Sequence, residues 1–293
     1  MKDEIIELLP KWYNDEHDMV LSNDIDSLAS CAVLKKVKGW DIKYFYDFEK
    51  LYSIYKYESE KEKCWIDVAI KEGHAFDNHV SKLTLSDDWN NEMINLNQIG
   101  WITNECYERK FAGSTLLEVW SLCNLPLPET EEGKMLLLAI DVAFKGFYTD
   151  KFHDIQKFYF EELEFEDLYD VTKRHSKDEF YEIVAKYGLN ADIKCKNGHL
   201  QTRVRIKEIG LLLGLDLELP EEMFQVIEEY DVIEANVEKY HKCANDVSYY
   251  IKSLALTYKN KMKYSKIHKE FNENDNLMDV ISFLKERKRN VRV

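Results

Sequence analysis

Short apolar runs alternate with amphipathic segments through the first half of the chain. Asp18–Ser22 is an apolar run with a polar end, which predicts a buried strand, and Ser27–Lys38 has apolar residues at helical spacing until Gly39. The same criteria predict strands at Ile42–Phe48, Cys64–Ile70 and Ala75–Val80, and helices at Ser114–Leu122 and Gly133–Ala143. This alternation favours an α/β fold, in which a mostly parallel sheet has helices on both faces.

The pattern changes in the second half. From about Phe152 onward, aromatic and aliphatic residues recur every three or four positions among Glu and Lys, as in amphipathic helices. Two such helices are expected at Glu221–Tyr240 and Asn245–Tyr258. We therefore predict two domains, an α/β domain over residues 1–150 and a smaller, mainly helical domain over residues 151–293.

The chain is acidic. Its 293 residues include 40 Lys and Arg against 55 Asp and Glu, which gives a formal net charge of −15. The electric field of such a protein repels long polyanions, so long nucleic acid is not expected as a partner. A small anionic ligand remains compatible with this charge where a bound metal supplies local positive charge. The basic run Lys285–Arg292 is interpreted as a solvated helix end, with a contact to nucleic acid or to a protein partner as the alternative.

The location of the protein is also constrained. The segment Met1–Pro10 lacks the apolar stretch and the cleavage site of a secretory signal. The longest apolar runs, Met135–Ile140 and Ile209–Leu215, are too short to cross a bilayer. The 6 cysteines are scattered without a Cys-x-x-Cys pair, so buried free thiols are expected. Together these features predict a cytoplasmic protein without membrane contact.

Acidic side chains lie at or near the ends of the predicted strands. They are Asp24 and Asp26 after the first strand, Asp67 near the end of the third, Asp77 with His79 in the fourth, and Asp141 after the apolar run Met135–Ile140. The carboxyl ends of the strands in an open α/β sheet face one crevice. These five acids and the histidine are therefore expected to converge on one rim of the sheet.

Converging carboxylates repel one another unless protons or cations compensate their charge. Oxygen ligands with a histidine favour Mn²⁺ or Mg²⁺ over Zn²⁺. Two such ions, about 3.5–4 Å apart, can activate water and polarise a phosphoryl oxygen. The pattern thus predicts metal-dependent phosphoester hydrolysis. The structural alternative is that Asp26 is simply the N-cap of the helix that begins at Ser27.

The order of these residues resembles the four motifs of the DHH phosphoesterase superfamily. The matching segments are Asp24-Ile-Asp26-Ser27, Trp65-Ile-Asp67, Phe76-Asp77-Asn78-His79-Val80 and Ile140-Asp141. The superfamily includes RecJ exonucleases, nanoRNases, cyclic-dinucleotide phosphodiesterases and family II pyrophosphatases. The resemblance covers roughly the first half of the chain, and it implies a hydrolase that uses one or two Mn²⁺ or Mg²⁺ ions.

The resemblance also implies a role for each matching position. Asp24 would bind one ion and Asp26 the other, and Asp67 would bridge the two. Asp77 would orient the third motif, and His79 would contact the substrate phosphate or complete a metal shell. In the same scheme Asp141 would complete the second metal site, with Asn78 as a further ligand. The catalytic residues would then be Asp67, Asp77 and His79.

Some positions depart from the family pattern. Val20 stands where many members have a histidine, and Ser22 stands where exonuclease-like members have an aspartate. Asn78 replaces the first histidine of Asp-His-His, and an amide oxygen binds transition metals more weakly than imidazole does. His74 is a candidate to replace this missing histidine. A degenerate member that binds a nucleotide or a protein partner without catalysis is therefore the alternative function. A helical interaction protein with coincidental acids is a third.

Candidate anion-binding groups lie outside the four motifs. Arg109 and Lys110 precede Ser114 and Thr115, whose hydroxyls and amides open a predicted helix. The small phosphorylated substrate would be a short oligonucleotide, a cyclic nucleotide or a polyphosphate.

The second half lacks the Gly-Gly-Gly-His loop of the family. Asn197-Gly198, between the strand-like segments Ala191–Lys196 and Leu200–Ile206, is typical of a type I′ hairpin turn. Arg203 and Arg205 on the second of these strands would face the same side, either as a grip for a phosphate or simply as an exposed strand face. The second domain would thus bind substrate or act as a lid. The oligomeric state is not predicted.

Overall fold

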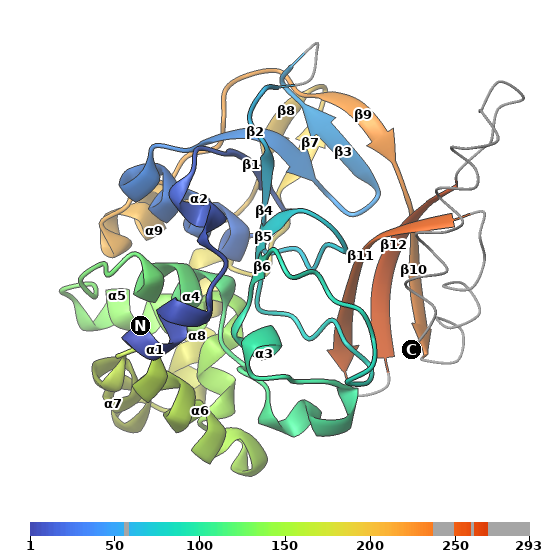
Figure 1. The fold of residues 1–293 in the computed structure, drawn as a ribbon. Coiled ribbons are helices and arrows are strands. Elements are labelled where there is room, and N and C mark those ends of the chain that lie inside the picture. The colour runs from blue at the N-terminus through green and yellow to red at the C-terminus, as the bar shows by residue number, and fades with distance from the viewer. Residues whose placement is uncertain (56–58, 237–248, 259–260, 269–293) are drawn as a thin grey trace, which may run out of the picture.

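A computed structural model describes residues 1–55, 59–236, 249–258 and 261–268 (Figure 1). Its largest sheet has the strand order β6-β5-β4-β1-β2-β3-β9. These strands are β1 (Asp18–Leu21), β2 (Asp41–Tyr46), β3 (Lys50–Ser53), β4 (Lys63–Ile66), β5 (His74–Phe76), β6 (Met93–Ile94) and β9 (Gln225–Glu229). The strands from β6 to β2 are parallel, and β3 and β9 add antiparallel pairs at one edge. The predicted mixed α/β fold with a mostly parallel sheet is confirmed.

The strand β1 lies at the centre of the sheet. Its apolar residues Met19, Val20 and Leu21 are fully buried, as the uninterrupted apolar run predicts. The chain passes from β1 to β2 on one side and later places β4 on the other. Such a reversal of strand order opens a crevice at the carboxyl ends of the strands.

Helices cover the sheet face that carries Met19 and Leu21 (Figure 1). The α-helices are α1 (Asp3–Leu8), α2 (Ile25–Lys38), α3 (Leu96–Ile99), α4 (Thr115–Leu122), α5 (Glu131–Ala139), α6 (Asp150–Glu162), α7 (Glu166–Arg174), α8 (Lys177–Tyr187) and α9 (Ile206–Leu213). The 3₁₀ turns are η1 (Lys11–Asn14), η2 (Asn104–Arg109) and η3 (Ile140–Gly146). One apolar cluster joins Leu28 of α2 and Leu136 of α5 to Phe160 and Phe180 of later helices. The core is thus continuous across residue 150, and the domain division remains a prediction.

Strands approach the other face of the sheet, where helices were expected. A small antiparallel sheet has the order β10-β12-β11, built from β10 (Asp231–Asn236), β11 (Tyr249–Tyr258) and β12 (Lys261–His268). The buried hydroxyl of Tyr46 lies 2.5 Å from Ser265 Oγ and 3.4 Å from Ser253 Oγ. Lys252 Nζ also lies 4.4 Å from the centroid of the Trp65 ring of β4. In the part of the chain that the structure describes, strands of the small sheet therefore lie against Tyr46 and Trp65 of this face, in place of the expected helices.

The helices predicted at Glu221–Tyr240 and Asn245–Tyr258 are wrong wherever the structure describes these segments. Gln225–Glu229 forms β9, although its side chains are all exposed. Backbone pairing with β3 stabilises this strand, since it buries no apolar face of its own. Residues 237–248 lie outside the described residues. The apolar spacing of the β9 segment also suits a helix, but pairing with a strand that is distant in the sequence has determined its structure.

The predicted hairpin is confirmed. Strands β7 (Lys194–Lys196) and β8 (His199–Gln201) pair antiparallel around Asn197 and Gly198, whose φ values are 52° and 83°. Both turn residues therefore have the positive φ that a type I′ turn requires. The strand expected over Leu200–Ile206 ends early, because the chain turns after β8 and α9 begins at Ile206.

Three further expectations concern the chain as a whole. Among the described helices, none combines the length and the apolar character needed to cross a bilayer. The described cysteines are free thiols; Cys31 and Cys64 are buried, while Cys106, Cys123 and Cys195 are only half-buried. The basic run Lys285–Arg292 lies outside the described residues.

Candidate metal centre

Parallel pairing brings the ends of β1, β4 and β5 to one rim. Leu21 pairs with Ile66, and Ile66 pairs with Phe76, so the three strands end at the same level. The ladder continues past the strands, because Asp67 N donates to Phe76 O at 2.8 Å and Asp77 N donates to Ile94 O at 3.0 Å. The predicted acids in the loops that follow are therefore neighbours in space.

The first motif has divided roles. Asp24 is the N-cap of α2, since its Oδ1 accepts from Ser27 N at 3.0 Å. The structural alternative that Asp26 is this cap is thus wrong. The carboxylate of Asp26, which is 2 % exposed, accepts from the amides of Thr115 at 2.9 Å and Leu116 at 2.7 Å. Asp26 therefore joins the start of α2 to the start of α4. Each of its two oxygens accepts one of these hydrogen bonds and keeps a second lone pair that could bind a cation.

Asp67 lies at the centre of the group. Its Oδ1 accepts a 2.7 Å hydrogen bond from Thr115 Oγ1 and lies 4.0 Å from His79 Nδ1. Its φ is 61°, in the left-handed region that residues other than glycine rarely occupy. Asp141 and Val142 have φ values of 47° and 51°. Such backbone conformations persist where the surrounding structure imposes them, and they are concentrated at functional sites.

The third motif holds its histidine from two sides. Asp77 Oδ1 lies 2.7 Å from His79 Nδ1, and Asp77 Oδ2 accepts from His79 N at 2.9 Å. Asn95 Nδ2 donates to Asp77 Oδ2 and to His79 O, both at 2.9 Å. With Nδ1 engaged, Nε2 is the ring nitrogen that can bind a cation or a phosphate.

The charges of these groups are strongly coupled. Burial raises the pKa of Asp24 to about 7, and the neighbouring Asp67 carboxylate adds to the shift. Burial likewise raises the pKa of Asp67 to about 6, although His79 opposes the shift. Burial would lower the pKa of His79, but Asp77 and Asp67 raise it to about 10. A divalent cation would relieve this repulsion between carboxylates.

Asp141 reaches the group from the end of α5. Burial of its carboxylate, opposed by His79, raises its pKa to about 6, and Asp24 adds to the shift. The residue remains solvent-exposed on one side, so water screens part of this effect. Asp24, Asp67, His79 and Asp141 thus come together from four separate segments.

The oxygen-rich donor set suits a hard divalent cation. The carboxylates of Asp24, Asp67 and Asp141 could hold Mn²⁺ or Mg²⁺. Neutral His79 would add Nε2 as a nitrogen ligand, whereas protonated His79 would donate from Nε2 to a phosphate instead. Asp67, Asp77 and His79 also form a group whose ligand atoms lie within 4.8 Å of one another. The residues present therefore fit the ion that the sequence predicts.

Asn78 is held mainly as a donor. Its Nδ2 donates to Gly113 O at 2.5 Å, and it also hydrogen-bonds the Asp141 carboxylate and lowers the pKa of that group. Only Oδ1 of the Asn78 side chain remains as a ligand for a cation. His74 does not replace the missing histidine, because it lies at the amino end of β5 while Asp77 follows the carboxyl end. Three residue steps along an extended chain separate the backbones of His74 and Asp77 by about 10 Å.

The predicted anion-binding groups are corrected in part. The amides of Thr115 and Leu116 at the start of α4 are already occupied by the side-chain oxygens of Asp26. Ser114 Oγ caps the helix by accepting from Leu117 N at 3.2 Å. Lys110 lowers the pKa of Asp141, although less than His79 does, whereas its neighbour Arg109 is exposed.

The second predicted phosphate grip is not formed as expected. Arg203 and Arg205 lie in the turn between β8 and α9 rather than on a strand. Both are exposed, and Arg205 Nη1 lies 3.4 Å from Glu208 Oε2. The alternation of strand residues therefore does not align these two side chains.

Sequence reasoning missed several supporting residues. Asn95 and Asn97 are fully buried, and Asn97 Nδ2 donates to Asn78 O at 2.6 Å. Glu118 of α4 is also buried nearby, and burial raises its pKa well above the ordinary range, with Asp77 adding to the shift. Asn95 and Asn97 directly follow the apolar pair Met93-Ile94, so the rule that selected the acids at strand ends could have found both.

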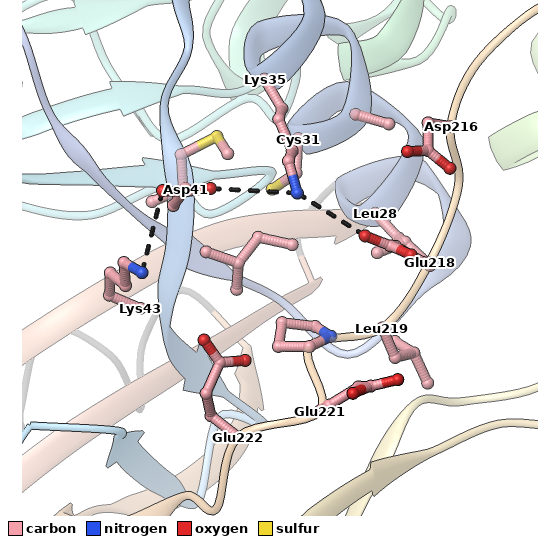
Figure 2. A pocket seen from close by; sticks show the side chains of 14 residues that line it. Leu28, Cys31, Lys35, Asp41, Lys43, Asp216, Glu218, Leu219, Glu221 and Glu222 are labelled. Atoms are coloured by element: carbon pink, nitrogen blue, oxygen red, sulfur yellow. Dashed lines mark ion pairs between the residues drawn. The ribbon is translucent and has the colours of Figure 1, made fainter.

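A cavity of about 530 Å³ lies elsewhere, between α2, the start of β2 and residues 216–222 (Figure 2). Lys35 Nζ spans its edge, 3.9 Å from Asp41 Oδ1 and 3.6 Å from Glu218 Oε1. Among the described residues that line this cavity, none belongs to the predicted site. The cavity and the carboxylate group are therefore separate features.

A comparison of this chain with family models, with curated proteins and with solved structures finds no match.

Proposed function

We propose that the chain is a metal-dependent phosphoesterase of DHH-like type that hydrolyses a small phosphorylated substrate. One observation carries this proposal: carboxylates from four separate segments meet at the carboxyl ends of β1, β4 and β5, together with a histidine. Isolated buried carboxylates are costly, and a group of them is most readily explained by a cation that they hold.

The proposed roles follow from the contacts. Asp24, Asp67 and Asp141 would hold Mn²⁺ or Mg²⁺, and the bound ion supplies a water of lowered pKa and polarises the phosphoryl oxygen. Asp77 orients His79 through a 2.7 Å contact between Oδ1 and Nδ1. Protonated His79 can stabilise negative charge that develops on the phosphoryl group. These roles do not require Asp26 to be a metal ligand.

The substrate class follows from charge. The net charge of −15 disfavours a long polyanion, whereas Lys110 beside Asp141 offers one local cation for a phosphate. A short oligonucleotide, a cyclic nucleotide or a polyphosphate is therefore proposed.

The test is hydrolysis by the full chain with Mn²⁺. Short oligonucleotides, cyclic dinucleotides and pyrophosphate are incubated with the wild type and with Asp67→Asn. We expect turnover of at least one compound, with a loss of about 10³-fold or more in the variant, because the Asp67 carboxylate would be a direct ligand of the ion. Asp170→Asn is the matched control, since Asp170 is exposed and pairs with Lys173. Equal turnover by Asp67→Asn and the wild type would end the proposal.

A second candidate function is nucleotide binding without catalysis. The side-chain nitrogen of Asn78 donates a 2.5 Å hydrogen bond to Gly113 O, so only the amide oxygen of this side chain could bind a metal ion. An amide oxygen is a weaker ligand for a transition metal than the imidazole that the family has at this position. Calorimetry separates the two candidates. Binding of a nucleotide without Mn²⁺, together with no Mn²⁺ binding at millimolar concentration, would favour the binding module.

A further inference from the structure

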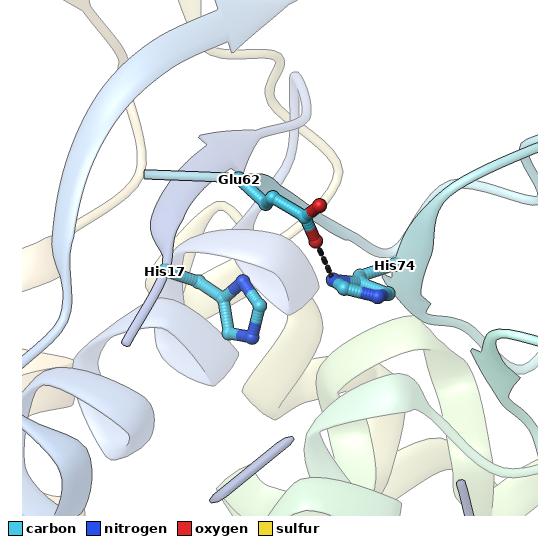
Figure 3. Close-up of side chains that lie close together, drawn as sticks. All are labelled: His17, Glu62 and His74. Carbon is cyan, nitrogen blue, oxygen red and sulfur yellow. Dashed lines mark ion pairs between the residues drawn. The ribbon is translucent and has the colours of Figure 1, made fainter. Parts of the chain in front are cut away.

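A second group of potential ligands lies at the opposite ends of the same three strands. His17 precedes β1, Glu62 precedes β4 and His74 begins β5 (Figure 3). One potential ligand atom from each of these residues lies within 4.8 Å of the other two. Glu62 and Asp67 are about 16 Å apart along β4, so this group is distinct from the carboxylate rim.

The imidazole of His17 is prepared to bind a cation. His17 is 3 % exposed, and its Nε2 lies 3.0 Å from Trp12 O. A carbonyl oxygen only accepts, so Nε2 carries the proton and donates, which leaves a bare lone pair on Nδ1. Within the described structure, this buried Nδ1 has no hydrogen-bond partner. Buried polar atoms without a partner are rare, and a bound ion is one of the recognised reasons for them.

The other two members face His17. His74 Nδ1 lies 3.1 Å from Glu62 Oε2, and Figure 3 shows both side chains on the same side of the His17 ring. His74 Nε2 lies 3.9 Å from Glu92 Oε2. Trp12 stacks on the His74 ring, with the centroids 4.6 Å apart and an interplanar angle of 8°, which fixes the plane of that ring.

We propose that His17, Glu62 and His74 form a binding site for a Zn²⁺-like divalent transition metal ion. Two imidazoles and one carboxylate make up a zinc ligand set, unlike the oxygen-rich group on the other rim. Trp12 O is the outer partner that holds the His17 ring, as such partners do in zinc sites, and the Trp12 ring holds that of His74 by stacking. The Glu62 side chain is 73 % exposed, so solvent can supply a fourth ligand. The ion would tie together the starts of β1, β4 and β5.

The test is Zn²⁺ and Co²⁺ binding by the full chain after treatment with a chelator. The experiment is done in the Asp67→Asn background, so that ions bound at the carboxylate rim do not contribute. We expect one ion per chain, a visible absorption band of four-coordinate Co²⁺ and a rise in the melting temperature with Zn²⁺. Glu62→Gln and His74→Ala should each lower the affinity at least 10-fold and weaken the Co²⁺ band.

Glu16→Gln is the matched control. Glu16 is an exposed neighbour of His17 that pairs with Lys61, so its variant should bind Zn²⁺ like the parent. Circular dichroism of each variant verifies that it folds. If His74→Ala does not fold, Glu62→Gln still tests the site, because the Glu62 side chain is exposed and its substitution should not disturb the core. The proposal is overturned if Zn²⁺ does not bind in the Asp67→Asn background. It is equally overturned if Glu62→Gln and His74→Ala bind Zn²⁺ as tightly as Glu16→Gln.

Discussion

The hydroxyl of Thr115 donates a 2.7 Å hydrogen bond to the carboxylate of Asp67, although 48 residues separate them in the sequence. This contact connects the first residue of α4 to the centre of the carboxylate group. The backbone amide of the same threonine donates to Asp26 at 2.9 Å. Thr115 therefore positions two of the acids that the proposed function depends on.

Thr115→Val removes this hydroxyl and keeps the shape of the side chain. We expect a 10- to 100-fold loss of Mn²⁺ affinity or turnover, as is typical when an outer partner of a metal ligand is lost. Thr115→Ser keeps the hydroxyl and is the control. Mn²⁺ calorimetry and the hydrolysis assay make the measurement, and equal results for both variants would exclude a positioning role.

The two acids of the first motif should respond differently to the loss of charge. Asp26→Asn removes a buried carboxylate that accepts two amides of α4, so we expect the free energy of unfolding to fall by about 1–3 kcal/mol. Asp24→Asn preserves the N-cap of α2, because asparagine caps helices well, and should alter stability little. Urea unfolding in a chelator measures both. For Asp24→Asn, the expected defect is weaker Mn²⁺ binding.

The stability of the metal-free chain should fall as the pH rises from about 4 to about 7. The pKa of Asp24 is raised to about 7 and that of Asp67 to about 6, both from an ordinary value of 3.8. In this window the native state retains protons that the unfolded chain releases, so rising pH favours unfolding. The pKa of His79, raised from 6.5 to about 10, makes a stabilising contribution that is complete below pH 6.5 and lost as the pH rises through 10.

Urea unfolding at a series of pH values with a chelator tests this dependence. Saturating Mn²⁺ should oppose it, because the ion binds the deprotonated carboxylates. Asp67→Asn should flatten the profile. If the stability of the metal-free chain instead rises with pH across this window, the pKa values of Asp24 and Asp67 are not raised in the native state.

Tyr46→Phe tests the packing of the small sheet on the large one. The Tyr46 hydroxyl is buried against Ser265 and Ser253, and the two serine hydroxyls lie 2.9 Å from each other. The serines keep each other as partners in the variant, so we expect a loss of only about 1 kcal/mol. Hydrogen exchange at β12 should accelerate, whereas exchange at β1 should change little. Unchanged exchange at β12 would show that this contact does not stabilise the small sheet.

The sequence alone predicts the rim of acids. Asp24, Asp67 and Asp77 each follow an apolar run, and parallel strands necessarily end on the same side of a sheet. The Asn197-Gly198 turn was equally predictable, because only a few residue types adopt positive φ at two consecutive positions. These features depend on residues that are close together in the chain or on a general rule of strand order.

Contacts between distant segments decided the rest. Gln225–Glu229 pairs with β3, and the apolar spacing of that segment does not indicate which strand it will pair with. The meeting of Asp26 with the amides of α4, and of His17 with Glu62 and His74, depends on where whole elements pack. Local spacing specifies which way a side chain faces along its own strand or helix. The position of that element relative to distant ones follows from burying the whole core, and only the tertiary structure contains that information.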